Sequence, residues 1–574
     1  MYRFGRLLHV VPIVALVFSG CAREPEPSWA PEIRDLLTSA SIPGLQMVTV
    51  EDGAVAEEMV FGSVNADSGS PVTPTTVFEA ASLSKPVTAY IAFRMVDRGE
   101  LDLDLPLWNL LEYERLAHDE RARAITPRLV LSHTTGLPNW GGTPLQLNAD
   151  PGQAWGYSGE GFVYLQRVME KVTGRSLEEL ARSEVFQPMG MEHSSFVWQD
   201  EYETLKASGH DVLGRPVEGL RHPDGANAAA SLHTTARDYG AFLAAVLQGE
   251  GLSPESHAAM IQPVTQADAW GPEETYPYVF WGLGWGIQEG ERGRAIWHWG
   301  DNGIYRAFVV GYPTLGDGLV YFTNSEAGLS VAEDLLSLVF RDEFWAARWL
   351  TYPDWDDPAF LADLALRRSF LRGFEEGMVV LDSLRADVDE EVGEELPGLM
   401  RFLAQEGESE SALRLAQMAT EEAPDDPEMM VLLAEIQTEG RLYAEAKETY
   451  LRAVESGADP GELGPRMAWL DEGLTSTGET QLTPDQLEAL AGQYGPRRVR
   501  REGSVLFYSR DGGPETRLIP LSPVLFGLEA SATFRLRFEP DPDGLVRKVH
   551  GLYSDGSTDE SERTRAGHQA SGSP

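Results

Sequence analysis

A serine and a lysine stand three residues apart in the stretch FEAASLSKPVTAY, which contains Ser82 and Lys85. Pro86 suits the first turn of a helix, and apolar residues then recur at four-residue spacing until Gly99. The stretch therefore predicts a helix that begins at or near Ser82. Residues three apart share one helix face, so the Lys85 amine can reach the Ser82 hydroxyl. A neutral amine there would act as a base and make the serine a nucleophile.

Two later stretches carry further side chains suited to acid–base chemistry. Tyr157 lies in WGYSG, before a helical pattern at 162–172, and His298 lies in the strand-rich stretch AIWHWGDNGIYRAFVVGYP. A lone Ser-x-x-Lys motif is weak evidence of catalysis, because ordinary residue usage yields roughly two such motifs by chance in a chain of this length. The three groups together are far more specific.

The order of these groups resembles the serine hydrolases of the class C β-lactamase and penicillin-binding-protein fold, whose signature is S-x-x-K, then Y-x-N, then K-T-G or H-x-G. The stretches TTVFEAASLSKPVTA, ITPRLVLSHTTGLPNW and SLHTTARDYGAF are also similar to that family. The resemblance extends over about residues 31–345. It implies a β-lactamase/transpeptidase-like α/β (α+β) domain that forms an acyl-enzyme. We expect no cofactor and no metal, because His133 in LSHTTG has no second ligand spaced with it.

Carried over residue by residue, the resemblance implies a nucleophile, its activating groups and an oxyanion hole. Ser82 would be the nucleophile, activated by Lys85 and by Tyr157 acting as a phenolate-like base or proton shuttle. The backbone N–H groups of Ser82 and Asp301 would form the oxyanion hole. His298 would orient the substrate or assist the leaving group. Whether Lys85 or Tyr157 takes the serine proton stays open.

Three positions in the second and third motifs are expected to contact the substrate: Gly159, Trp299 and Gly300. Gly159 stands where the family's asparagine would offer an amide to the substrate. Trp299 stands where a threonine hydroxyl would help to hold the carboxylate of a penicillin. His298 is largely neutral at pH 7.5 and is a poorer carboxylate anchor than lysine. We therefore expect weak or absent β-lactamase activity.

Two functions from different classes remain open. The favoured one is an exported serine hydrolase of esterase, D-amino-acid amidase or peptidase type, acting on a small-molecule ester or peptide. The alternative is a low-turnover binding protein that uses the penicillin-binding fold and helical repeats to hold a cell-wall fragment or a protein partner. The intact set of Ser82, Lys85 and Tyr157 favours the hydrolase, because a pure binder has no need of it.

The elements that must position these groups lie in the first of three regions. Strand-like and helical runs alternate over 29–350, which predicts a mixed α/β domain. A helical pattern follows over 357–470, and short alternating strands over 482–556 predict a small β domain. The polar tail at 558–574 is expected to be disordered.

The helical region contains an internal repeat. Small residues recur 34 positions apart, for example Ala412 and Ala446, or Ala419 and Ala453. That period resembles tetratricopeptide repeats, in which small side chains let paired helices pack closely. Only two repeats are visible, so we expect packing on the preceding helices. A groove for a protein partner is the alternative to a spacer role.

The first residues resemble an export signal. Arg3 and Arg6 precede an apolar run at 7–18, which is typical of a secretory signal over residues 1–20. Cys21 is the only cysteine, so internal disulfides are excluded. The stretch FSGC resembles the bacterial lipoprotein cleavage motif. We therefore expect an exported protein with lipid on Cys21, on the periplasmic side of the outer membrane if the cell has one; an ordinary signal peptide is the alternative.

The charge of the chain limits its partners. Its 46 basic and 90 acidic residues give a formal net charge of −44. Nucleic-acid binding needs a basic face, so that partner is excluded. The same charge disfavours docking on anionic lipid, and we expect membrane contact through the lipid anchor only.

Overall fold

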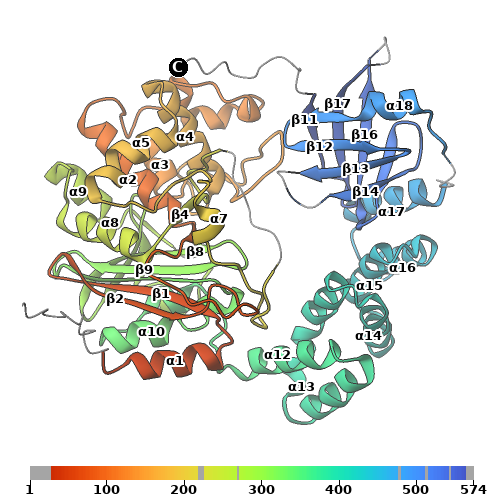
Figure 1. The fold of residues 1–574 in the computed structure, drawn as a ribbon, viewed down its shortest axis with the longest axis horizontal. Helices are drawn as coiled ribbons and strands as arrows, with labels where there is room; N and C mark the ends of the chain where they lie inside the picture. The colour runs from red at the N-terminus through yellow and green to blue at the C-terminus, as the bar shows by residue number, and fades with distance from the viewer. Residues whose placement is uncertain are drawn as a thin grey trace, which may run out of the picture.

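The computed structural model describes residues 27–217, 225–267, 270–475, 480–510, 513, 515–541 and 545–563, with the backbone alone at 386–394 and 475. These residues form an α/β domain, a helical region and a small β domain in that order (Figure 1). The expected multidomain fold class is confirmed. The signal segment and Cys21 lie outside the described residues. Within the described ranges, no helix is long and apolar enough to cross a membrane.

The first domain is built on an antiparallel sheet of eight strands in the order β2-β1-β10-β9-β8-β7-β6-β5. These strands are β1 (Gly44–Glu51), β2 (Ala54–Gly62), β5 (Thr265–Gln266), β6 (Val279–Trp281), β7 (Gly286–Gly290), β8 (Gly293–Asp301), β9 (Arg306–Tyr312) and β10 (Asp317–Thr323). β1 pairs with β10, with Leu45 opposite Thr323. The sheet therefore forms only when the two ends of the domain come together.

Helices cover both faces of this sheet. Figure 1 shows α8 (Ala236–Gln248) on one face and α1 (Ala30–Ser39) with α10 (Ala332–Val339) on the other. Because helices cover both faces, β1 and β9 are buried at almost every position. A separate two-stranded sheet pairs β3 (Phe78–Ala81) with β4 (Leu232–Thr234). The remaining α-helices of the domain are α2 (Ser84–Asp97), α3 (Pro127–Leu131), α4 (Gly159–Thr173), α5 (Leu177–Ala181), α6 (Gln187–Met189), α7 (Tyr202–Leu205), α9 (Pro254–Met260) and α11 (Trp345–Trp349).

The helical region leads from the first domain to the β domain in an arc (Figure 1). Its helices are α12 (Pro358–Phe370), α13 (Phe374–Gln405), α14 (Ser409–Glu422), α15 (Pro427–Glu439), α16 (Tyr443–Glu455) and α17 (Pro460–Thr475). α14 and α16 carry the small residues that recur along the sequence. Ala412, Ala419, Ala446 and Ala453 are all buried, so the recurring positions are packing positions.

α12 joins the first domain to the helical region. Phe360 and Leu364 pack in one hydrophobic cluster with residues of α1 and α10. Leu366 and Phe370 pack in the next cluster, with residues of α13 and α14. The two halves of the helix therefore bury side chains in different domains, and the helical region is docked on the first domain through shared apolar contacts.

The β domain follows α18 (Pro484–Leu490) and is an antiparallel meander. Its strands are β11 (Gly492–Tyr494), β12 (Arg497–Glu502), β13 (Val505–Arg510), β14 (Thr516–Pro520), β15 (Leu525–Leu528), β16 (Ser531–Pro540), β17 (Val546–Tyr553) and β18 (Thr558–Glu562). Tyr494, the last residue of the first strand, bridges to Arg563 just beyond the last strand. This bridge brings the two edges together, so the sheet is nearly closed into a barrel.

The expected boundary of the polar tail differs from the structure. We expected a disordered tail from residue 558, but Thr558–Glu562 form β18 against β17. The side chains of this strand meet Arg497, which is 1% exposed, through an ion pair with Asp559 and a hydrogen bond to Ser561. A buried guanidinium is costly without partners, so the contact orders a segment whose composition alone indicates disorder.

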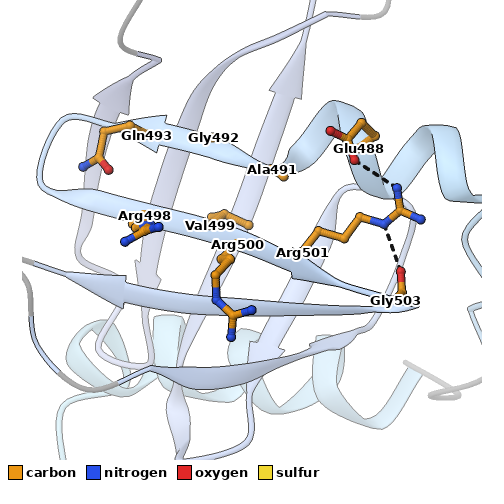
Figure 2. Close-up of a pocket in the computed structure, with 9 residues that line it drawn as sticks. All are labelled: Glu488, Ala491, Gly492, Gln493, Arg498, Val499, Arg500, Arg501 and Gly503. Atoms are coloured by element: carbon orange, nitrogen blue, oxygen red, sulfur yellow. Dashed lines mark hydrogen bonds and ion pairs between the residues drawn. The ribbon is translucent and has the colours of Figure 1, made fainter.

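A shallow hollow of about 620 Å³ lies on the β11–β12 hairpin (Figure 2). Arg501 in its lining pairs with Glu488, at 2.9 Å. Arg500 pairs with Glu502 and Glu515, at 2.8 and 2.7 Å. Much of the positive charge of this hollow is therefore neutralised, and it lies on a different domain from Ser82.

The docking of α12 predicts a stability effect in the full chain. Replacing Phe360 by alanine should destabilise the first domain by about 3 kcal/mol, because it leaves a cavity in the shared cluster. Leu361→Ala is the matched control, since that side chain on the same helix is 44% exposed and surface changes cost within about 0.5 kcal/mol. Thermal unfolding followed by tryptophan fluorescence reports mainly on the first domain, because every tryptophan except Trp469 precedes α12. Equal unfolding temperatures for the two variants would contradict this role of α12.

Candidate active site

Ser82 lies in the turn that joins β3 to α2. Ala81 has a φ of +48°, a left-handed conformation that turns the chain sharply into the helix. Ser82 is half-buried, and Lys85 one turn later is fully buried. The Lys85 Nζ lies 3.0 Å from Ser82 Oγ and donates to the Ala229 carbonyl at 2.9 Å. The structure thus brings together the two groups whose spacing first indicated chemistry.

The environment of Lys85 favours its neutral form. Burial lowers the pKa of the Lys85 amine well below its ordinary value. Its two hydrogen-bond partners are a hydroxyl and a carbonyl, and neither carries a charge that would stabilise an ammonium. A neutral amine has a lone pair, so it can accept the proton of Ser82.

Tyr157 lies against Lys85 just before α4. The Lys85 Nζ is 4.6 Å from the centroid of the Tyr157 ring. Burial raises the pKa of the Tyr157 phenol above its ordinary value, and Ser82 opposes part of that rise. The phenol is therefore protonated at neutral pH. His133 supports this segment, because its Nδ1 accepts the Ser158 N–H at 3.0 Å and its ring lies 4.4 Å from the Tyr157 ring.

His298 on β8 is buried in its neutral form. Its Nδ1 donates to the Trp299 carbonyl at 2.8 Å, which leaves a lone pair on Nε2. No described residue forms a hydrogen bond with that Nε2. Burial, with a smaller effect of Lys85, lowers the pKa of His298 to about 3. The ring centroid is 6.2 Å from that of Tyr157, so His298 lies beside the motif residues without a positive charge.

The end of β8 lies beside the strand that leads to Ser82. Asn302 donates its backbone N–H to Tyr305 at 3.2 Å, and hydrogen bonding alternates along an antiparallel strand, so the Asp301 N–H faces away from β9. Gly300 passes so close to the Ala80 carbonyl that a Cβ would collide with it. The Asn302 side chain also donates to Glu79 at 2.9 Å. These contacts bring Asp301 to the edge where the Ser82 turn lies.

Gly159 is enclosed by the loop that precedes the second motif. Its N–H donates to the Asn139 side chain at 3.0 Å. A Cβ at this position would lie 2.9 Å from both the Asn139 carbonyl and the Trp140 ring. The asparagine of the Y-x-N pattern therefore does not fit here without movement of the loop. Trp140 itself is 52% exposed beside this glycine.

Trp299 belongs to an aromatic cluster around Tyr157. Its ring lies 4.8 Å from Tyr157 and 5.8 Å from Trp270. Trp270 also contacts Tyr157 at 5.5 Å and is 46% exposed, so it forms the outer surface of this cluster. Trp281 and Trp297 are fully buried, as expected for packing residues. The side of the site near Trp299 is therefore an apolar wall.

The model of the family described as Beta-lactamase matches residues 29–340. The chain belongs to the β-lactamase family. Relatives of this family member include penicillin-binding protein 4 of Amycolatopsis lactamdurans, 26% identical over 54% of this chain and 87% of the relative. Penicillin-binding protein 4* of Bacillus subtilis (strain 168) is 24% identical over 50% of this chain and 70% of its own. Esterase EstB of Burkholderia gladioli is 28% identical over 31% of this chain and 54% of its own.

A solved relative of the β-lactamase domain is the D-alanine carboxypeptidase AmpC from Burkholderia cenocepacia. It is 21% identical, with a TM-score of 0.46, and the match covers 54% of this chain and 97% of that one. The family model over residues 29–340 confirms the family resemblance expected from the motifs, whereas the activity of this family member is a separate question.

Sequence reasoning missed several residues at this β-lactamase-family site. Ala229 supplies only a backbone carbonyl, which no side-chain pattern announces. Trp270 lies outside all three motifs and reaches Tyr157 only through the fold. Asn139 and Trp140 had a signal, because they end the stretch LSHTTGLPNW that is similar to the family.

The pKa directions predict which group controls the pH dependence. The rate of fluorophosphonate labelling of Ser82 should rise with pH and level off well below pH 10.5, because protonated Lys85 cannot accept a proton and its pKa is lowered. Lys85→Arg should slow labelling by about 10²- to 10⁴-fold. His298→Gln is the control, since His298 is already neutral above its pKa of about 3. If the fall in labelling rate at low pH disappears in His298→Gln, the pH dependence belongs to the histidine instead.

Proposed function

We propose that this protein is a serine hydrolase that forms an acyl-enzyme on Ser82. The observation that carries the proposal is the 3.0 Å contact between the buried Lys85 amine and the Ser82 hydroxyl. A buried lysine without a carboxylate partner costs stability, and a protein that only binds ligands gains nothing from it. Membership of the β-lactamase family supports the same assignment.

In the proposed reaction, neutral Lys85 is the base. Ser82 Oγ attacks the substrate carbonyl carbon as its proton passes to Lys85 Nζ. The carbonyl oxygen becomes an oxyanion, which the N–H groups of Ser82 and Asp301 stabilise. The raised pKa of Tyr157 favours a phenol that relays a proton over a phenolate that removes one. This choice between the two bases follows from their opposite pKa shifts.

The second half of the proposed cycle releases the products. As the tetrahedral intermediate collapses, the bond from the carbonyl carbon to the leaving group breaks. The leaving group takes the proton through Tyr157, and the acyl group stays on Ser82. Water then attacks the acyl carbon and loses a proton to Lys85. The bond from that carbon to Ser82 Oγ breaks as Lys85 returns the proton to Oγ, and the carboxylic acid product leaves. His298, with its free Nε2, would orient the substrate.

We infer that the substrate is an ester, amide or peptide without a carboxylate that must be anchored. His298 is uncharged, and the apolar ring of Trp299 occupies the position of a carboxylate-binding hydroxyl. The loop at Asn139 fills the place of the missing amide side chain beside Gly159. These features support esterase, D-amino-acid amidase or peptidase activity over penicillin hydrolysis.

The substrate proposal predicts a specific activity profile. The full chain should hydrolyse short-chain p-nitrophenyl esters, because they need only the nucleophile, the base and the oxyanion hole. The kcat/KM for benzylpenicillin should be about 10²-fold or more below that of a β-lactamase that has both polar partners, since each missing partner costs about 1 to 3 kcal/mol. Ser82→Ala should abolish both activities, with Ser39→Ala at the exposed end of α1 as a control. Efficient penicillin hydrolysis without esterase activity would contradict the substrate assignment.

We also propose that the chain is exported and carries lipid on Cys21, and that residues 357–470 are tetratricopeptide-like. The first proposal rests on the apolar run followed by the only cysteine. The second rests on the buried alanines at corresponding positions of α14 and α16.

The lipid proposal is tested in a bacterial host. The wild-type chain should fractionate with membranes, and mass spectrometry of its N-terminal peptide should find diacylglycerol on Cys21. Cys21→Ser should remove both properties, because an acyl chain contributes about 0.8 kcal/mol per buried methylene to membrane binding. An unmodified Cys21 in the wild-type protein, or cleavage at another residue, would contradict the anchor.

A further inference from the structure

Asp301 is held by its side chain as well as by the sheet. Its carboxylate accepts the Gly303 N–H at 2.8 Å and the Tyr352 hydroxyl at 2.5 Å, and it forms an ion pair with Arg306. Arg306 is the first residue of β9 and is 8% exposed. Tyr352 follows α11 and lies beyond residue 340, where the family match ends. Three donors thus converge on one carboxylate at the end of β8.

Side-chain anchors matter at this place because β8 extends past its neighbour. The last residue of β8 that pairs with β7 is Trp297, opposite Gly286. Beyond it, β8 has a partner strand on one side only, with Asp301 opposite Arg306 of β9. The Asp301 N–H faces the other, unpaired side, where ladder hydrogen bonds do not fix its direction.

Tyr352 is itself fixed by contacts of the segment that follows it and by Arg306. Trp355 donates its backbone N–H to Ser330 at 3.1 Å and its indole N–H to Asp334 at 2.8 Å. Asp357 then caps the first turn of α12, which is docked on the first domain. Arg306 packs over the Tyr352 ring at 5.6 Å. Tyr352 therefore has a defined position from which to hold Asp301.

The electrostatics of the cluster suit a neutral phenol that donates to a carboxylate. Burial raises the pKa of Tyr352, against the opposing effects of Arg306 and a hydrogen bond from Trp299. The phenol therefore keeps its proton at neutral pH. A charge-assisted hydrogen bond of this kind is stronger than one between neutral groups.

We propose that Tyr352 and Arg306 are positioning residues for the oxyanion hole: by holding the Asp301 carboxylate, they keep the Asp301 backbone N–H directed toward the carbonyl oxygen of the substrate. The inference rests on the proposed acyl transfer at Ser82. It makes a residue outside the matched family domain part of the structure that supports the reaction.

The helical region reaches the two residues that hold the Asp301 carboxylate. A cavity of about 470 Å³ has Arg306 and Tyr352 on its wall, together with Phe360 and Asp363 of α12. The segment that carries Tyr352 continues directly into that helix. Tyr352 and α12 thus line the same cavity and are joined by a short segment of chain.

The test uses Tyr352→Phe in the full chain and a pair of aryl esters that differ only in a C=O or C=S group. Sulfur is a larger and weaker hydrogen-bond acceptor, so the ratio of the two kcat/KM values reports on the oxyanion hole. Deleting one donor outright typically costs about 10²- to 10³-fold in kcat. Losing the tyrosine that positions the donor should cost less than losing the donor. We expect a fall of about 10-fold in kcat for the oxygen ester and a similar fall in the oxygen-to-sulfur ratio of kcat/KM, with little change in KM.

Tyr312→Phe is the matched control. It removes another tyrosine–aspartate hydrogen bond, from Tyr312 to Asp342 at 2.9 Å, at the opposite end of β9. Its oxygen-to-sulfur ratio should equal that of the wild type. In an Asp301→Ala background, Tyr352→Phe should have no further effect, because the tyrosine acts through that carboxylate.

The outcomes separate this inference from the function on which it rests. A Tyr352→Phe ratio equal to that of the control, or a full effect that persists in Asp301→Ala, would overturn the positioning role while ester hydrolysis stands. A wild-type chain that is inactive on the oxygen ester would overturn the proposed function and this inference with it. Arg306→Lys should lower the ratio as well, since a lysine keeps the charge but cannot reproduce the planar donor geometry.

Discussion

The burial of the Lys85 amine is the constraint on which the rest of the site depends. An ammonium in this position has no carboxylate partner among the described residues, and desolvation strongly disfavours the charged form. The neutral amine persists because α2 is buried along most of its length, between elements that come from distant parts of the chain. The apolar packing that makes up the core of the domain therefore also lowers the pKa of the Lys85 amine.

The same burial shifts the pKa values of neighbouring groups in opposite directions. Desolvation lowers the pKa of Lys85 and of His298 and raises that of Tyr157, so burial favours the neutral form of all three. A neutral amine can accept a proton from a hydroxyl, and a neutral phenol can donate one, whereas an ammonium could only donate. This environment suits neutral acyl groups better than anionic substrates. The exposed Trp270 and Trp140 extend the apolar surface outward.

The C-terminal regions are tied to this site through packing. α12 places Phe360 in the core cluster of the first domain, and the segment before it brings Tyr352 to Asp301. A β-lactamase-family domain followed by helices thus has packing contacts through which the appended helices reach the candidate site. The β domain lies further along, where Arg535 on β16 pairs with Glu472 of α17 at 2.8 Å.

The sequence by itself determined the family, the order of regions and the pairing of Ser82 with Lys85. These depend on local spacing, since residues three apart on a helix meet in any fold that forms the helix. Only the tertiary structure decided that Lys85 is desolvated, that Asn139 and Trp140 enclose Gly159, and that Tyr352 reaches Asp301. The sequence also did not predict that 558–562 form the strand β18, because this depends on Arg497 in a distant strand. Such contacts join residues far apart in the chain, and no periodicity records which of them the packing brings together.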